Sequence, residues 1–110
     1  MARSHTSKSK PYLLFSTAPS KKEAHTIAQL LIAKRLAACV NIIPVASLFR
    51  WQGKIEHANE ILLVIKTGKN RLKELKKVLI QNHSYSVPEL IGCPIEWGHE
   101  PYLKWLTESL

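Results

Sequence analysis

The sequence predicts an α+β domain with the element order β-α-β-β-α-β and a further helix near the C-terminus. The central pair of strands comes from one long hairpin between Leu36 and Lys66, because two apolar runs rich in β-branched residues flank the turn-forming pair Gln52-Gly53. A short apolar run and an amphipathic helical segment precede this hairpin, and a second amphipathic segment and another apolar run follow it. The order of these strand-like and helix-like segments predicts the fold class.

Length and composition fit a single globular domain of 110 residues, of which 45% are apolar. We assign residues 11–110 to this domain and the polar, basic residues 1–10 to a flexible N-terminal tail. The 16 basic and 8 acidic residues give a net charge of +8, which favours anionic partners. No segment has the character of a signal peptide or the length of a membrane span, so we expect a cytoplasmic protein. In a reducing compartment Cys39 and Cys93 are expected to be buried free thiols that act as small core side chains.

The first strand and the first helix have clear local signals. Tyr12–Thr17 is a short apolar run closed by Pro19, as expected of a central strand. Ser20 and Glu23 have the spacing of a capping box, in which each side chain accepts a hydrogen bond from a backbone N–H at the helix start. The residues that recur at helical intervals on the inner face are Ala24, Ile27, Ala28, Leu31 and Arg35.

The hairpin and the second helix follow. Phe49 and Trp51 alternate onto one face near the hairpin tip. Pro44 predicts a bulge or kink in the first arm, since proline cannot donate to a ladder. Asn70 is expected to cap the second helix. The apolar stripe of that helix consists of Leu72, Leu75, Val78 and Leu79.

The last part of the chain contains a loop, a strand and a short helix. Residues 82–88 are polar and end in proline, which predicts a loop before a fourth strand at Glu89–Trp97. Pro94 makes this an edge strand or a bulged one. Pro101 fits the first turn of a last helix at Tyr102–Leu106.

This order of elements is the split βαβ or ferredoxin-like arrangement, with both main helices on one face of the sheet. The other face carries apolar residues, and the hairpin is too long for so small a sheet, so we expect three or more subunits to cover one another. Trp51, Tyr102 and Trp105 could each stack on a base or ring, but we favour them, with Phe49, as interface anchors.

A ligand cleft is predicted from three polar residues. Glu89 would be costly to bury alone, so it either faces solvent or pairs with a base such as Lys66. We favour the pair, beside Tyr85 in a cleft between subunits. A cation, an anion and a phenol suffice to bind a polar ligand, although a purely structural ion pair would look the same. His83 and Glu89 could also offer an imidazole and a carboxylate to a metal, or His83 could be a solvated loop residue.

Several motifs together resemble the CutA divalent-cation tolerance proteins. The matching segments are Lys34–Pro44, Trp51–Glu56, Lys66-Thr67, His83–Tyr85, Pro88–Leu90 and Tyr102–Trp105. The resemblance implies a ferredoxin-like subunit, a homotrimer whose hairpins embrace the neighbour, and a cytoplasmic role tied to copper and other divalent metals, with no enzymatic reaction. It also implies an architecture similar to the PII signalling proteins, which bind small anionic effectors between subunits.

The copper ligands implied by this resemblance are only partly present. Ser16 stands where the family has a cysteine, and Asn82-His83 stands where it has two adjacent histidines. A hydroxyl and an amide are poor copper ligands beside thiolate and imidazole. We therefore expect a divalent metal such as copper to bind weakly, through His83 and Glu89.

Two functions follow from these observations. The first is a non-enzymatic homotrimer of divalent-metal tolerance, since the sequence contains no nucleophile elbow, phosphate-binding loop or HExxH motif. The alternative is a PII-like sensor that binds a small anionic metabolite. RNA binding by an RRM-like sheet is disfavoured, because Ile61–Ile65 lacks the aromatic residues that stack bases.

Overall fold

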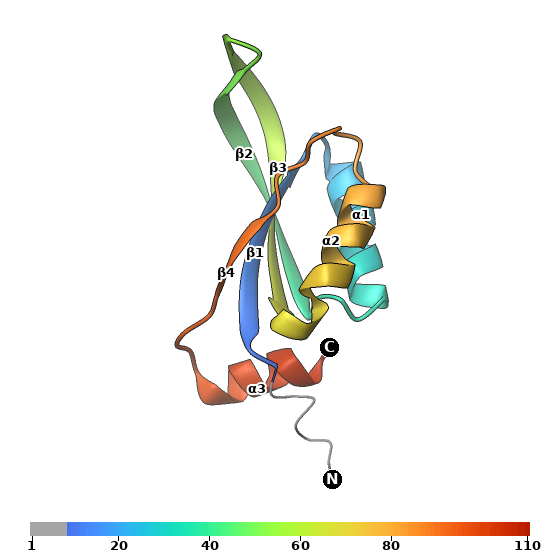
Figure 1. Cartoon of the computed structure of the whole chain (residues 1–110), viewed down its shortest axis with the longest axis vertical. Helices are drawn as coiled ribbons and strands as arrows, with labels where there is room; N and C mark the ends of the chain where they lie inside the picture. Colours follow the sequence, from blue (N-terminus) through green and yellow to red (C-terminus); the bar gives the residue numbers. More distant parts are fainter. Residues whose placement is uncertain (1–8) are drawn as a thin grey trace.

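The computed structural model describes residues 9–110, in which a four-stranded antiparallel sheet is covered on one face by two helices (Figure 1). The strands are β1 (Pro11–Ala18), β2 (Cys39–Trp51), β3 (Lys54–Gly68) and β4 (Ile91–Pro94), and they lie in the order β2-β3-β1-β4. The helices are α1 (Lys21–Ala33), α2 (Leu72–Gln81) and α3 (Glu100–Glu108). The predicted α+β class and ferredoxin-like order are confirmed. Residues 1–8 of the expected tail lie outside the described residues, whereas Lys10 accepts a backbone hydrogen bond from Lys69 at 2.8 Å.

The start of α1 confirms half of the predicted capping box. The Ser20 hydroxyl accepts a hydrogen bond from the Glu23 N–H at 3.2 Å. The Glu23 carboxylate does not complete the box but accepts a hydrogen bond from the N–H of Ser84 at 2.9 Å, far along the chain. Arg35 was predicted to lie on the inner face of this helix, which is wrong because α1 ends at Ala33 and Arg35 has a φ of 57°.

The hairpin forms as predicted, with a two-residue turn. Gln52 and Gly53 have φ values of 50° and 80°, which is the primed turn geometry that suits the twist of paired strands. The pairing from Cys39 opposite Lys66 to Trp51 opposite Lys54 has no inserted residue, so the bulge predicted at Pro44 is wrong. Proline is tolerated there because β2 is an edge strand.

The outer half of the hairpin projects beyond the sheet (Figure 1). β1 pairs with β3 only from Ile61 onward, so residues 54–60 of β3 pair with β2 alone. Large apolar side chains are therefore exposed on this arm, and Leu48 and Ile55 are 66% and 63% exposed. This confirms the expected overhang.

The second half of the chain departs from the prediction at its element boundaries. A 3₁₀ turn at Lys69–Arg71 precedes α2, and Asn70 donates its N–H to Ser9 Oγ at 3.0 Å instead of capping the helix. β4 is an edge strand, as expected, but it is shorter than predicted, and Glu89 lies before it in the loop. Pro101 lies in the first turn of α3, as predicted.

The core lies between the sheet and α1 and α2. Its fully buried side chains include Ile27, Leu31, Leu63, Ile65, Leu75 and Leu79. Cys39 is only partly buried and Cys93 is exposed, so the prediction that both thiols belong to the core is wrong. Two buried hydroxyls in the sheet are satisfied by backbone carbonyls of other segments: Thr67 donates to Leu36 at 2.6 Å, and Ser16 donates to Glu89 at 2.7 Å. The Ser16 bond fixes the position of the loop that precedes β4.

Positive charge is concentrated on the helical layer. The segments 20–36 and 69–82 hold nine basic and two acidic residues, a net charge of +7 out of the total of +8. The remaining residues hold seven basic and six acidic ones. Among the described helices, none combines the length and apolar character needed to cross a membrane.

Gly92 provides a test of the contact between β1 and β4. It pairs with Leu14, and a Cβ at this position would collide with the Leu14 side chain and lie 2.9 Å from the carbonyl oxygen of Leu13. We expect Gly92→Ala to lower the free energy of unfolding by about 1–3 kcal/mol, as overpacking does. Urea denaturation at fixed protein concentration measures this. Gly53→Asn is the control, because a Cβ there meets nothing within 4 Å and Asn tolerates a positive φ; equal losses for both variants would contradict the steric explanation.

Candidate functional site

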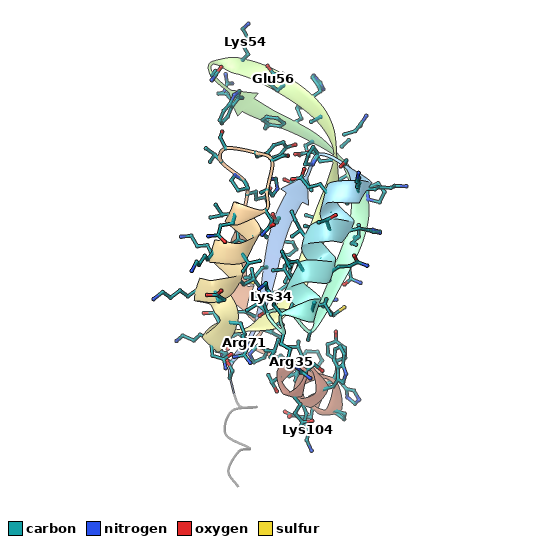
Figure 2. The ribbon with its side chains drawn as sticks, turned by 90° about the vertical axis from the view of Figure 1, so that its right-hand side faces the viewer. Lys34, Arg35, Lys54, Glu56, Arg71 and Lys104 are labelled. Atoms are coloured by element: carbon teal, nitrogen blue, oxygen red, sulfur yellow. The ribbon has the colours of Figure 1, made fainter. Side chains whose placement is uncertain are left out.

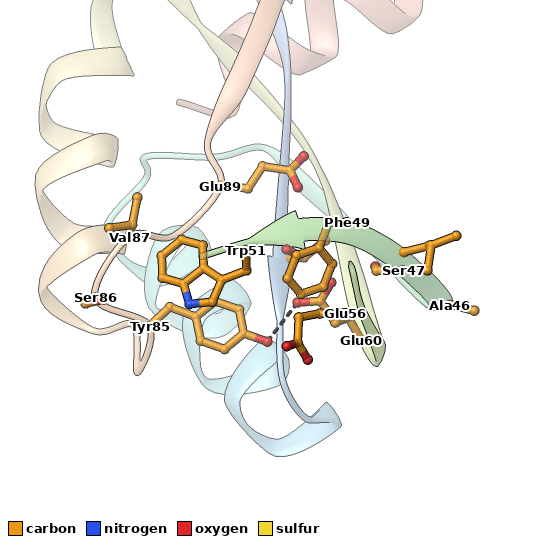
Figure 3. A pocket seen from close by; sticks show the side chains of 12 residues that line it. Ala46, Ser47, Phe49, Trp51, Glu56, Glu60, Tyr85, Ser86, Val87 and Glu89 are labelled. Carbon is orange, nitrogen blue, oxygen red and sulfur yellow. Dashed lines mark hydrogen bonds between the residues drawn. The ribbon is translucent and has the colours of Figure 1, made fainter. Parts of the chain in front are cut away.

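A groove of about 880 Å³ lies where the hairpin leaves the sheet (Figure 3). Its walls come from the outer halves of β2 and β3, the end of β1 and the loop that follows α2. Its aromatic side chains are Phe49, Trp51 and Tyr85, and its charged side chains are Glu56, Glu60 and Glu89.

The ladder between β2 and β3 decides which hairpin side chains share the groove. Phe49 on β2 lies opposite Glu56 on β3. Trp51 is two residues from Phe49 along β2, and Glu60 is four residues from Glu56 along β3. Because side chains alternate across a strand, all four point to the same face of the hairpin. The sequence predicted the shared face of Phe49 and Trp51, but not the two acids that join them.

His83 holds the loop that carries Tyr85. Its side chain is fully buried, and its Nε2 lies 2.8 Å from the carbonyl oxygen of Thr17, which can only accept, so Nε2 is the protonated nitrogen. Its Nδ1 accepts the N–H of Tyr85 at 3.0 Å. Glu23 Oε2 lies 3.4 Å from the same Nδ1 and anchors Ser84. His83 is therefore a structural residue of the loop in this chain, with both ring nitrogens in use.

Tyr85 reaches from this loop to the hairpin. Its hydroxyl donates a hydrogen bond to Glu60 Oε2 at 2.7 Å, and its ring centroid lies 4.9 Å from that of His83. Burial, the hydrogen bond to the Glu60 carboxylate, and the negative charges of Glu60 and Glu23 raise the pKa of Tyr85 from 10.0 to about 12. Tyr85 is thus a neutral donor at physiological pH.

Lys66 does not line the groove of its own chain. The sheet register places Lys66 opposite Leu13 and Cys39, and its ammonium contacts Asn41 and lies 3.9 Å from Cys39 Sγ. Within residues 9–110, no ion pair joins Lys66 to Glu89. Tyr85 and Glu89 do line one groove, as expected, but the cation of the predicted trio is missing and the phenol binds a different acid.

The residues that stand at the family's copper positions are also engaged otherwise. Ser16 is buried and bonded to Glu89, and the Asn82 side-chain amide donates to Val78 at 2.8 Å. In the part of the chain that the structure describes, no three His, Cys, Asp or Glu side chains form a group that could hold a metal ion. A metal ion in the groove would need further ligands from water or another subunit.

The aromatic residues of α3 lie outside the groove. Tyr102 and Trp105 form a pair with ring centroids 5.4 Å apart, and each is a little under half exposed. The two predicted groups of aromatic residues therefore occupy separate surfaces, one on the hairpin and one on the last helix.

Glu60 is the main residue that sequence reasoning missed. It is 7% exposed and lies directly before the apolar run Ile61–Ile65. An acidic residue at the edge of a buried strand is costly unless it is paired, so its position was a usable signal. Its partner Tyr85 could not be identified from spacing, because the contact depends on where the loop crosses the sheet.

The Tyr85–Glu60 contact should make stability depend on pH in the alkaline range. In the unfolded chain the phenol loses its proton near pH 10, but in the folded chain it keeps the proton until about pH 12. The stabilisation is therefore complete below pH 10 and is lost as the pH rises from 10 to 12. We expect Tyr85→Phe to lower the free energy of unfolding by about 1–3 kcal/mol at pH 9 and by less at pH 11. Urea denaturation at both pH values measures this, and an equal effect at both would contradict the assignment.

Known proteins share this architecture. The family described as CutA1 divalent ion tolerance protein matches residues 12–109. The chain is 42% identical over 97 residues to the divalent-cation tolerance protein CutA of Archaeoglobus fulgidus (88% of this chain, 95% of that protein), and 45% identical over 94 residues to that of Thermus thermophilus (84% and 91%). The crystal structure of CutA1 from Oryza sativa matches with a TM-score of 0.88 at 39% identity, covering 92% of this chain and 94% of that one. The resemblance inferred from the sequence is confirmed, and the chain belongs to the family of CutA1 divalent ion tolerance proteins.

Proposed function

We propose that this chain is a non-enzymatic homotrimeric protein of divalent-cation tolerance, with copper among its cations, and that it takes up cations in the groove beside the hairpin. The observation that carries this proposal is the charge of the groove. Its charged lining residues, Glu56, Glu60 and Glu89, are all acidic, although the chain as a whole has a charge of +8. The names of the relatives, which refer to divalent-cation tolerance, support the same function.

The projecting hairpin supports assembly. Phe49 and Trp51 on one face of the hairpin are 42% and 48% exposed, and Leu48 and Ile55 on the other face are more exposed still. Large exposed apolar side chains on a projecting arm of a small protein are typical of an interface. Within residues 9–110, the sheet face opposite α1 and α2 is not covered by a helix of its own layer (Figure 1). In a closed ring of three subunits, the hairpin of each subunit could contact this face of its neighbour.

The neighbouring subunit would complete the cation site. Carboxylates are suitable ligands for hard divalent ions, and two or three of them leave coordination positions for water or for a second chain. We place this function in the cytoplasm, because Cys39 and Cys93 are both free thiols, as a reducing compartment maintains them.

The alternative, an effector sensor for a small anionic metabolite, has less support at this groove. An anion there would face carboxylates, and the predicted cationic partner Lys66 contacts Asn41 and Cys39 instead. An effector of this class would need basic residues contributed by a neighbouring subunit.

Trp51→Ala tests the assembly. A truncated interface aromatic commonly costs about 2 kcal/mol or more, so we expect the variant to dissociate at protein concentrations at which the wild type remains a trimer. Sedimentation velocity over a dilution series measures this. Trp97→Ala, which removes an exposed indole away from the hairpin, is the control. A wild type that sediments as a folded monomer at all concentrations would contradict the proposal.

Metal uptake is tested with carboxylate variants. We expect Cu²⁺ to bind weakly, with a Kd above about 1 μM by calorimetry, because the described residues supply no complete set of ligands. Glu56→Gln and Glu60→Gln should weaken binding further, whereas Glu74→Gln on the outer face of α2 should not. Tight binding that both groove variants leave unchanged would place the metal elsewhere.

A further inference from the structure

We propose that the groove beside the hairpin binds an organic cation, a small molecule with one or more ammonium groups on an apolar frame. This inference rests on the proposed function in that it takes the same groove as the cation site, and it names a class of ligand other than a bare metal ion. The carboxylates of Glu56, Glu60 and Glu89 would neutralise the ammonium charge, and Phe49, Trp51 and Tyr85 would contact the rest of the molecule.

The first support is an acidic side chain without a positive partner. Glu60 is more than nine-tenths buried and lines the groove. Within residues 9–110, its carboxylate accepts one side-chain hydrogen bond, from Tyr85, and takes part in neither of the two ion pairs. A buried carboxylate is costly unless a cation compensates it, so a ligand that brings a positive charge to Glu60 would be stabilised there.

The second support is the aromatic character of the walls. Figure 3 shows the rings of Phe49, Trp51 and Tyr85 around the same space as the carboxylates of Glu56 and Glu60. Alkylammonium groups are attracted to the faces of aromatic rings, and sites built from several rings are used to recognise quaternary ammonium ligands. A strongly hydrated metal ion gains little from such walls, whereas an alkylated ammonium group gains from both the rings and the acids.

The third support is the size of the groove and the spread of its acids. A volume of about 880 Å³ is in the range of small-molecule sites and far larger than a metal ion requires. The carboxylates belong to no group of three metal-ligating side chains within the described residues. Separated carboxylates around a large space walled in part by aromatic rings suit a molecule that spans them.

The position of the ring of Tyr85 is fixed before any ligand arrives. His83 accepts its N–H, Glu60 accepts its hydroxyl, and Glu23 holds the preceding residue, Ser84. A ligand therefore does not have to order this loop when it binds, which lowers the entropic cost of binding.

Among the described residues, no basic one lines the groove. Arg50 lies between Phe49 and Trp51 on β2 but points to the other face of the hairpin, because side chains alternate along a strand. Lys54, which pairs with Trp51 at the tip, points outward from the end of the hairpin (Figure 2). The charged side chains that line the groove are therefore all carboxylates.

The test is calorimetric titration of the assembled full-length chain with benzyltrimethylammonium and with spermidine, and with benzylsulfonate as the anion of matched frame. We expect both cations to bind with saturation and the anion not to bind. Glu60→Gln keeps the acceptor for Tyr85 and removes the charge, so it should weaken cation binding by about tenfold or more, a change of ~1.4 kcal/mol. Glu74→Gln on α2 should leave the affinity unchanged, and sedimentation of each variant confirms that its assembly is intact.

The inference would be overturned if the wild type bound neither cation with saturation at concentrations up to about 10 mM, which still detects in part sites with a binding free energy weaker than −4.1 kcal/mol. Equal binding of benzylsulfonate, or an unchanged cation affinity in Glu60→Gln, would also overturn it. So would a crystal structure with a basic side chain of a neighbouring subunit seated against Glu60.

The outcomes also separate this inference from the proposed function. If the trimer forms and binds metal ions but not the organic cations, this inference fails and the proposed function stands. If the chain is a monomer that binds the organic cations through Glu60, the proposed assembly fails and the inference stands.

Discussion

The uninterrupted ladder between β2 and β3 is the constraint on which the rest of the structure depends. Its inner half supplies the centre of the sheet and its outer half supplies the arm, and one register serves both. A slip of one residue would turn the inner face of β3, with its buried Leu63 and Ile65, toward the wrong side. The same slip would move Phe49 and Glu60 away from Tyr85. Core packing and groove chemistry are therefore fixed by the same set of backbone hydrogen bonds.

Most of the fold could be predicted from the sequence, because it depends on local periodicity and on turn residues. The alternation along the hairpin, the apolar stripes of α1 and α2, and the Gln52-Gly53 turn each act over a few residues, and all are present in the structure. The errors concern positions where a distant segment competes with a local signal. Asn70 was expected to cap α2, but its backbone binds Ser9, and the second half of the Ser20–Glu23 capping box is lost because Ser84 takes the carboxylate.

The candidate site could be predicted only in part, because partners of polar side chains are chosen by the tertiary structure. Tyr85 and Glu89 were predicted as cleft residues and Phe49 and Trp51 as interface anchors, and all four line the groove. Within the chain Glu89 does not meet Lys66, since the register places Lys66 opposite Leu13 and Cys39, and a pairing across subunits stays a prediction. His83 was considered as a metal ligand, but whether a loop histidine faces solvent or is buried depends on how the loop crosses α1, which no local pattern reports.

The separation of charge between the helical layer and the hairpin has a kinetic consequence. A net charge of +7 on the helical layer and an acidic groove at the hairpin give each subunit an uneven distribution of charge. At low ionic strength, cations approaching the helical side would be turned away, and the capture zone would shrink to the hairpin side. Added salt shortens the Debye length to about 8 Å at 0.15 M, so it would suppress this long-range repulsion before it weakens contacts inside the groove. Rates of cation capture would then rise with salt over a range in which steered association between opposite charges normally slows.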